Sequence, residues 1–482
     1  MMQRTTMLLI LCLGFTTAIS AQSPEDNQPQ SPEPQSATVR AEVNDAIRMA
    51  IHPEPAPDRA NEYRLLPSDS ELNDGNAAVV ILRITYEQQK FMNDVVPKMR
   101  ELLELDYDDP RIFAEFPFNS FYRQLARAAY IRDADWNYPL REQPMWEILL
   151  PDAQSMRTFV DRGLRLHCGT LIAQGQLDEA RQCLLVQLAC ARHLARTPLL
   201  VNRLIAESAC SSAIDRTEVL ISQPKSPNLY WALAMLPDSI VDTSKSLQWE
   251  ASGLELSIPS LGGKFGYPPI GHEDWNEIVN TFSSLMVQEM GRGMTVLEGA
   301  ALQAKLLAIA HKELEESGKY DKATRDKMLP NELVMRWVLM VNDNVNGEIE
   351  AAFSLPPPLA IPRLQRLEAR IQRLVKDTGA PATPFMQSIL PLYFSLHSFD
   401  RSVKQLQVVE AIRDHASRTG KLPEKLTDTQ LPCPKDPLTE KPFQYRVSNT
   451  QAFLSPAQIP GVDADIQRRK TYRLKIASKQ QK

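Results

Sequence analysis

The sequence predicts a mainly α protein of stacked antiparallel helical hairpins, tetratricopeptide-like in part, with a small C-terminal β-hairpin. Apolar residues recur at spacings of three and four over long stretches, which is the period of a helix with one buried face. Glycine is scarce (18 residues) and proline plentiful (36 residues). That balance favours helices separated by rigid breaks over a glycine-turned β protein. Alternation with a period of two, typical of strands, begins only near the C-terminus.

Residues 1–21 have the pattern of a secretory signal peptide. Arg4 precedes an apolar run from Met7 to Gly14, and Ala18-Ile19-Ser20 or Ala21 offers a cleavage site. The run is too short to span a membrane, and no later stretch reaches the roughly 18 consecutive apolar residues that a span needs. We therefore expect an exported protein of the periplasm or extracellular space, with no membrane span after cleavage.

The mature chain is expected to begin with a disordered lead at 22–40, because its Pro, Ser, Gln and Glu residues offer nothing to bury. One helical domain is predicted from 41 to 430. A short helix over 39–51 and a long amphipathic helix over 76–105 come first. The aromatic-rich segment 106–155 is predicted to form short helices that cover a core.

The hairpin core of this domain is predicted over 154–237, where two or three antiparallel helices alternate with short turns. Gly175 is suited to the left-handed residue that closes the first of these helices. The pattern G-x-L-D-E-A from Gly175 to Ala180 resembles the turn and second helix of a tetratricopeptide unit. The resemblance covers one unit, and we find no repeat at the 34-residue period of that family.

Long helices are predicted over 273–353 and terminal helices over 363–419. The helical pattern that starts near Glu273 would place Ala304 and Ala308 inward, with His311 continuing the same face. Pro356 to Pro358 separate the two groups of helices. A small β-containing segment is predicted over 431–482: PFQYRV and TQAFLS form a hairpin, and TYRLKIAS alternates like a third strand.

Three stretches resemble a family. They are PNLYWALAMLP (227–237) with the following Glu250, DGNAAVVIL (74–82), and VEAIRDHASRTGKLPEKLTD…PKDPLTEKPFQYR (409–446). In these the chain is similar to an uncharacterised family of exported, mostly helical proteins from planctomycete-type bacteria. The resemblance implies export and a helical fold, and it implies no particular activity.

A second resemblance is local. Asp436-Pro437 through Phe443 and Tyr445 is similar to the C-terminal turn of type II secretion pseudopilins, with Glu440 where that pattern usually has Gly. It implies the shape of one turn. A role as a secretion-system accessory would rest on this turn alone.

The cysteines are the strongest candidates for a chemically functional site. Cys168, Cys183, Cys190 and Cys210 lie close together in the sequence, and His167 and His193 are near them. Cysteines on apolar helix faces are most often small core residues, which is the favoured interpretation. A disulfide is the second interpretation, and a metal site with Cys168, Cys183, Cys190 and His193 as ligands is the third. No cofactor, metal or catalytic residue is predicted.

The function predicted from these patterns is that of an exported, non-enzymatic helical scaffold whose grooves bind a protein or peptide. The alternative is an extracytoplasmic hydrolase with a site near the Gly/Pro-rich loop 257–272 or beside His311, because an imidazole titrates near neutrality. The secretion-system accessory is a second alternative. The net charge of −5 and the lack of a basic run make nucleic acid an unexpected partner. The oligomeric state is left open.

Overall fold

The computed structural model confirms a mainly α protein with a small sheet near the C-terminus. It describes residues 46–87, 98–99, 101–105, 119–140, 148, 150, 153, 155–238, 240–241, 244–253, 275, 278, 296–378, 389–448 and 450–477. The chain divides into two compact units. Unit 1 contains 1–136, 150–243 and 394–482, and unit 2 contains 137–149 and 244–393.

The centre of unit 1 is a layer of helices formed by the predicted hairpin core. A π-helical segment, Met156–Gly163, continues into α8, Leu164–Ala173. Gly175 has φ +75°, the left-handed conformation predicted for it, and it leads into α9, Leu177–Ala195. The next helix, α10, runs from Leu200 to Ile221 and packs along α9. Small buried residues on the two helices, such as Ala189 and Ala213, allow this close approach.

Shorter elements complete the helical part of unit 1. They are the 3₁₀ turns Asp69–Glu71 and Leu426–Asp428, the parallel strand pair β2 (Asn73–Asn76) and β3 (Ile131–Asp133), and helices α3 (Ala77–Glu87), α6 (Asn119–Ala129) and α11 (Tyr230–Ala234). The helix predicted over 76–105 is confirmed at 77–87, and 88–97 lies outside the described residues. In the aromatic-rich segment the prediction missed β3. Its three residues pair with β2, which lies far away in the sequence.

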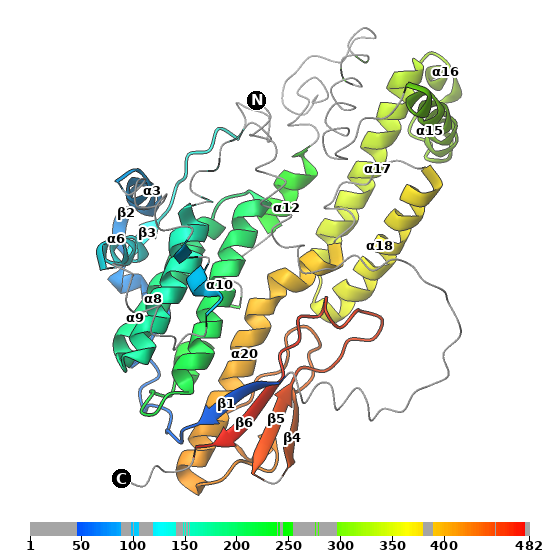
Figure 1. The fold of residues 1–482 in the computed structure, drawn as a ribbon. Coiled ribbons are helices and arrows are strands. Elements are labelled where there is room, and N and C mark those ends of the chain that lie inside the picture. Colours follow the sequence, from blue (N-terminus) through cyan, green and yellow to red (C-terminus); the bar gives the residue numbers. More distant parts are fainter. Residues whose placement is uncertain are drawn as a thin grey trace. The chain divides into compact units, whose positions relative to one another are not determined.

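The C-terminal sheet has the strand order β1-β6-β5-β4. The predicted hairpin is confirmed as β4, Gln444–Ser448, paired with β5, Gln451–Ser455. The predicted third strand is β6, Tyr472–Ile476, antiparallel to β5. Figure 1 shows the fourth strand, β1, in blue beside the red β6, so the sheet joins residues from both ends of the described chain.

The prediction of a helix over 39–51 was wrong in its described part. Ile47–Ile51 is strand β1, which pairs in parallel with β6. A five-residue segment has too few intrahelical hydrogen bonds to be a stable helix in isolation, so its state depends on what it packs against. Here β6 offers a free edge, and Met49 and Ile51 are buried on the inner side of the sheet.

The inner side of the sheet is attached to the helices of unit 1 by buried polar side chains. On α20, Ile389–Thr419, the Gln405 amide donates to the carbonyls of Leu454 and Lys470 at 3.1 and 3.0 Å. The Tyr472 hydroxyl donates to Glu218 of α10 at 2.6 Å. These bonds satisfy polar groups that would be costly to bury unpaired, and they fix which side of the sheet faces solvent.

The regular elements of unit 2 in the described residues are helices. It contains α12 (Ser244–Ala251), α15 (Val296–Glu316), α16 (Lys322–Arg325), α17 (Pro330–Phe353), α18 (Pro357–Thr378) and the first residues of α20. The predicted separation at Pro356–Pro358 is confirmed, although Pro357 is also the first residue of α18. Proline suits that position because the first turn of a helix has no partner for its N–H. Of the long helix that was predicted to start near Glu273, Trp275 and Ile278 are helical and buried, and the next described residues form α15 from Val296.

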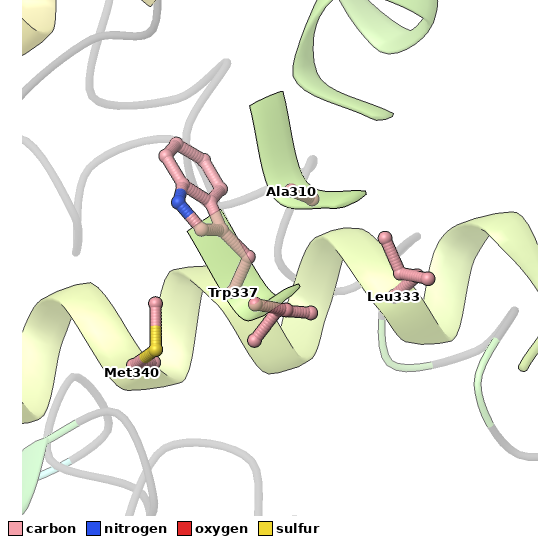
Figure 2. Close-up of a cluster of buried hydrophobic side chains, with 5 residues drawn as sticks. Ala310, Leu333, Trp337 and Met340 are labelled. Carbon is pink, nitrogen blue, oxygen red and sulfur yellow. The ribbon is translucent and has the colours of Figure 1, made fainter. Parts of the chain in front are cut away.

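The core of unit 2 between α15 and α17 is a cluster of buried apolar side chains, namely Ala310, Leu314, Leu333, Trp337 and Met340, most of them labelled in Figure 2. The Trp337 indole N–H donates to the Glu313 carboxylate at 2.6 Å. Ala304, Ala308 and His311, predicted to face inward, are exposed. The inward face of α15 is instead the one that carries Ala310 and Leu314, because those residues meet α17.

None of the helices in the described ranges is both long enough and apolar enough to cross a membrane.

Candidate binding face on the C-terminal sheet

The outer face of the C-terminal sheet carries a row of cationic and aromatic side chains. Side chains alternate between the two faces of a strand, so the burial of Met49, Leu474 and Leu454 places their neighbours outside. The strand register puts Arg48 opposite Arg473, Arg473 opposite Phe453, and Phe453 opposite Arg446. This row, from β1 through β6 and β5 to β4, crosses the whole sheet.

A second row runs beside the first. Ala50 lies opposite Lys475, and Lys475 lies opposite Gln451. We call the two rows together the basic face, defined by Arg48, Arg446, Arg473, Lys475, Phe453, Gln451 and Ala50. The described strand residues on this side of the sheet include four cations and no Asp or Glu. The sheet therefore presents a concentrated positive charge although the whole chain has a net charge of −5.

Two contacts hold side chains of the basic face in place. The Arg473 Nε–H donates to the Gln451 side-chain oxygen at 2.6 Å. Arg446 lies over the Phe453 ring, with its Cζ 5.5 Å from the ring centroid, in a cation–π contact. Both partners are neutral, so the positive charges are oriented without being neutralised. Among the described residues, none of the four cations has a carboxylate within ion-pair distance.

An open hollow of about 600 Å³ lies over β1, β6 and the start of β5. Its lining includes three residues of the basic face that carry charge, Arg48, Arg473 and Lys475, and it extends to Ala477 beyond the end of β6. A concave surface lined by one sign of charge attracts ligands of the opposite sign and orients them. The arrangement suits the binding of an anionic group.

The direct opposition of Arg48 and Arg473 carries a cost in the free protein. Like charges directly opposite each other on adjacent strands repel, and this lowers the stability of the sheet. The neighbouring cation Lys475 adds to the repulsion. An anion placed between these side chains would remove it. Such a local conflict with folding is frequent at functional sites.

The cysteines and histidine predicted as metal-ligand candidates are all buried in the helical layer of unit 1. Each thiol lies against a backbone carbonyl: Cys168 against Ala180, Cys183 against Leu164, and Cys190 against Leu125, at 3.6–3.7 Å. The His193 Nε2 lies 3.1 Å from the Ala128 carbonyl oxygen. All the described cysteines are free, and the described residues contain no cluster of three or more potential metal ligands.

Burial also sets the charge state of these groups. It raises the pKa of the Cys190 thiol to about 12, and it lowers the pKa of the His193 imidazole to about 4, with Arg192 adding to that shift. Burial likewise lowers the pKa of His167, which lies beside the Tyr122 ring, to about 4. Near neutral pH the cysteine is therefore a thiol and both histidines are uncharged, which suits packing inside a helical layer.

Of the two places considered for a hydrolase site, only His311 lies in the described residues. His311 is exposed on α15, and loop 257–272 lies outside the described residues. Buried carboxylates do occur in unit 1, but structural contacts engage them. Glu207 accepts the Phe399 N–H at 3.1 Å, and Asp436 forms a buried ion pair with Arg401 at 3.0 Å. Both contacts fix α20. The Ser398 hydroxyl also donates to Glu207 at 3.4 Å and the Thr439 hydroxyl to Asp436 at 3.2 Å, so neighbouring structure engages both carboxylates.

The basic face was not predicted from the sequence. The alternation in TYRLKIAS was recognised, and it puts Arg473 and Lys475 on one side of a strand. Had 47–51 been assigned as a strand, the same rule would have placed Arg48 with them. No basic run marks the site in the sequence, because each strand contributes only one or two cations.

Comparison of the chain with protein families, with curated proteins and with solved structures finds no match. The proposals below therefore rest on the residues of the chain itself.

Proposed function

We propose that this chain is an exported, non-enzymatic binding protein whose basic face binds an acidic segment of a protein partner. The observation that carries the proposal is the group of four cations, Arg48, Arg446, Arg473 and Lys475, without a carboxylate on the same face of the described sheet. Complementary charge gives such a surface both speed of association and selectivity for an acidic partner.

The helical layer supports this role by holding the sheet in place. The side chains of Gln405 and Tyr472 attach its inner side to α20 and α10. The cations on the outer side therefore sit on a rigid platform, and a ligand does not have to order them from a flexible loop. The scaffold predicted from the sequence thus gains a specific surface, and that surface lies on the sheet instead of in a groove between helices.

Export is part of the proposal and rests on the sequence at 1–21. Expression of the full-length chain in a Gram-negative host, followed by fractionation and N-terminal sequencing, tests it. We expect a periplasmic protein whose first residue lies between about 19 and 23, after the small residues that suit signal peptidase. A cytoplasmic protein that retains Met1 would contradict export.

The binding experiment uses a fluorescein-labelled peptide of alternating Glu and Val and a matched peptide of alternating Gln and Val. Fluorescence anisotropy at low salt should show binding of the Glu peptide only. Because the contacts are electrostatic, the affinity should fall as NaCl is raised from about 50 to 500 mM and the Debye length shrinks. Equal affinity for the Gln peptide would overturn the proposal.

Charge reversal locates the binding. The double variant Arg48→Glu/Arg473→Glu should reduce affinity for the Glu peptide at least tenfold, equivalent to about 1.4 kcal/mol. The matched control is Arg59→Glu/Arg127→Glu, which makes the same change in net charge at two exposed residues outside the sheet. If both variants weaken binding equally, only net charge matters and the basic face is not the site. Binding of an oligonucleotide or polyphosphate in preference to the Glu peptide would contradict the choice of partner.

A further inference from the structure

Within the described residues, one of the two backbone edges of strand β1 is unpaired. The Ile47 N–H donates to the Thr471 carbonyl at 2.8 Å, and the Ile51 carbonyl accepts the Ala477 N–H at 2.9 Å. In a parallel pair, every second residue of a strand directs its N–H and C=O toward the neighbouring strand. Ile47, Met49 and Ile51 therefore face β6, while the backbone groups of Arg48 and Ala50 face away from the sheet.

The outward backbone groups of Arg48 and Ala50 have no hydrogen-bond partner within the described ranges. Both residues are exposed, and β1 forms the edge of the sheet in Figure 1. An edge of this kind is a template for a further strand, and proteins usually protect it with charged side chains, proline, a bulge or a covering segment. Of these devices the described strand has one charged residue, Arg48. The described strand has a regular register over all five residues and contains no proline.

The open edge and the basic face meet at the same two residues. Arg48 and Ala50 place their side chains on the basic face while their backbone groups point to the open edge. The hollow over β1 and β6 includes both residues. A strand added beside β1 would therefore place every second side chain next to Arg48, on the side that also carries Arg473 and Lys475.

We propose that the acidic partner segment binds in extended conformation and adds a fifth strand to the sheet, along β1. This inference rests on the proposed function, because it names how the acidic segment is held. Backbone hydrogen bonds to Arg48 and Ala50 fix the segment, and acidic side chains at alternate positions face the cations. The segment has an acidic residue at every second position and no proline within the paired stretch.

The unpaired backbone groups at the edge of β1 distinguish a peptide ligand from other polyanions. A polypeptide backbone carries N–H and C=O groups at the spacing of a strand, and it can satisfy the donors and acceptors of Arg48 and Ala50 together. A nucleic acid or an acidic polysaccharide could neutralise the charges, but its backbone has no N–H and C=O groups at the spacing of a strand to pair with Arg48 and Ala50. The edge thus favours an acidic peptide over these alternatives.

Backbone methylation of the ligand tests the added strand without changing the protein. Two versions of the Glu-Val peptide carry N-methyl groups, one at all Glu residues and the other at all Val residues. In an added strand only one of these two sets of N–H groups faces β1. We expect one methylated peptide to lose at least tenfold in affinity, while the other binds within about twofold of the unmethylated peptide.

Which of the two methylated peptides loses affinity also shows whether the added strand is parallel or antiparallel to β1. The Glu side chains share the face of Arg48, so an antiparallel added strand directs the Glu N–H groups toward β1, and a parallel strand directs the Val N–H groups toward it. If both methylated peptides bind like the unmethylated one, or if both lose affinity equally, strand addition is overturned.

A variant of the protein gives a second, independent test of strand addition. Ala50→Pro removes the N–H that points to the open edge and leaves every cation in place. Proline is tolerated on an edge strand where its missing N–H faces solvent, so the fold should persist, which circular dichroism and the thermal midpoint check. We expect at least a fivefold loss of affinity. The control Ala50→Val retains the N–H and should bind within about twofold of the wild type.

The outcomes separate the two proposals. One possible outcome is that the unmethylated Glu peptide binds and Arg48→Glu/Arg473→Glu abolishes binding, while N-methylation of the Glu or Val residues and Ala50→Pro have no effect. In that case the basic face binds acidic peptides without adding a strand. If the unmethylated peptide does not bind at low salt, both proposals fail.

Discussion

Arg48 and Arg473 stand directly opposite each other on neighbouring strands, although they come from opposite ends of the described chain. Their side chains share the exposed face of the sheet, and Lys475 lies one row away. Two arginines in this position repel each other, so folding alone does not account for the pair. Binding of the proposed acidic segment would relieve this repulsion, and the repulsion itself can be measured in the absence of any ligand.

We predict that Arg48→Gln raises the stability of the free protein at low salt by several tenths of a kcal/mol, because the repulsion with Arg473 is removed. Urea unfolding in about 20 mM buffer measures the change. In about 1 M NaCl the gain should disappear, since the Debye length falls to about 3 Å. Arg59→Gln, at an exposed position away from the sheet, is the matched control. A loss of stability in Arg48→Gln at low salt would contradict the like-charge interpretation.

A second prediction concerns the buried ion pair of Arg413 and Glu410 on α20, which are 2.8 Å apart with both side chains fully buried. Arg413 also donates to the carbonyls of His52, Pro227 and Ser226, and so joins the segment after β1 to the segment before α11. Arg413→Met should cost about 3–5 kcal/mol, because it leaves the Glu410 charge buried without its partner.

The double variant Arg413→Met/Glu410→Leu separates charge from packing. It should recover part of the loss, since no isolated charge remains, although the three carbonyls still lack their donor. Chemical denaturation of both variants gives the comparison. If the double variant is less stable than Arg413→Met alone, the loss does not come from an uncompensated charge.

Asp400 on α20 gives a prediction about pH. Burial raises the pKa of its carboxyl to about 7, and the nearby Asp238 carboxylate adds to the rise, against the opposing effect of Lys404. The unfolded chain loses this proton near pH 4, so between pH 4 and 7 the folded state binds more protons. The free energy of unfolding contributed by this group therefore falls as pH rises through that window.

Replacement of Asp400 by Asn removes the ionisation. We expect Asp400→Asn to stabilise the protein more at pH 8 than at pH 5, with a difference of about 1–2 kcal/mol after allowance for partial solvent exposure. Thermal unfolding of variant and wild type at the two pH values measures it. Asp58→Asn, at an exposed site, serves as the control. A stabilisation that does not change with pH would refute the raised pKa.

The turn after Asp436 supplies a backbone prediction. Glu440 is exposed and has φ +54°, in the left-handed region that favours glycine. Its N–H donates to the Asp436 carbonyl at 2.8 Å, so the conformation is held by the turn. Glu440→Gly should stabilise the protein by up to about 1 kcal/mol, and Glu440→Val should destabilise it, because a β-branched residue is strained at positive φ.

Glu440→Ala controls for the loss of the side chain and should lie between the other two variants. The thermal midpoints of the three proteins give the order. If Gly is the least stable of the three, the entropy that it adds to the unfolded chain outweighs the strain that it relieves.

Much of the helical architecture follows from local patterns in the sequence. The period of apolar residues predicted α8, α9 and α10, and Gly175 marked the turn between the first two, because only local sterics and one buried stripe are needed to specify them. The hairpin of β4 and β5 and the alternation in β6 were also readable, since neighbouring strands in the sequence pair across a short connection. The inward face of α15 could not be predicted, because packing against α17 determines which of its side chains are buried.

The site is a different case. The residues 47–51, IRMAI, are too short to specify a helix or a strand, and their state is decided by pairing with β6 at the other end of the chain. The sequence by itself determined that Arg473 and Lys475 share one side of a strand. Only the tertiary structure placed Arg48 beside them, put Arg446 in the same row, and left one edge of β1 unpaired among the described residues, because hydrogen bonding between distant strands sets register and neighbours that no local pattern contains.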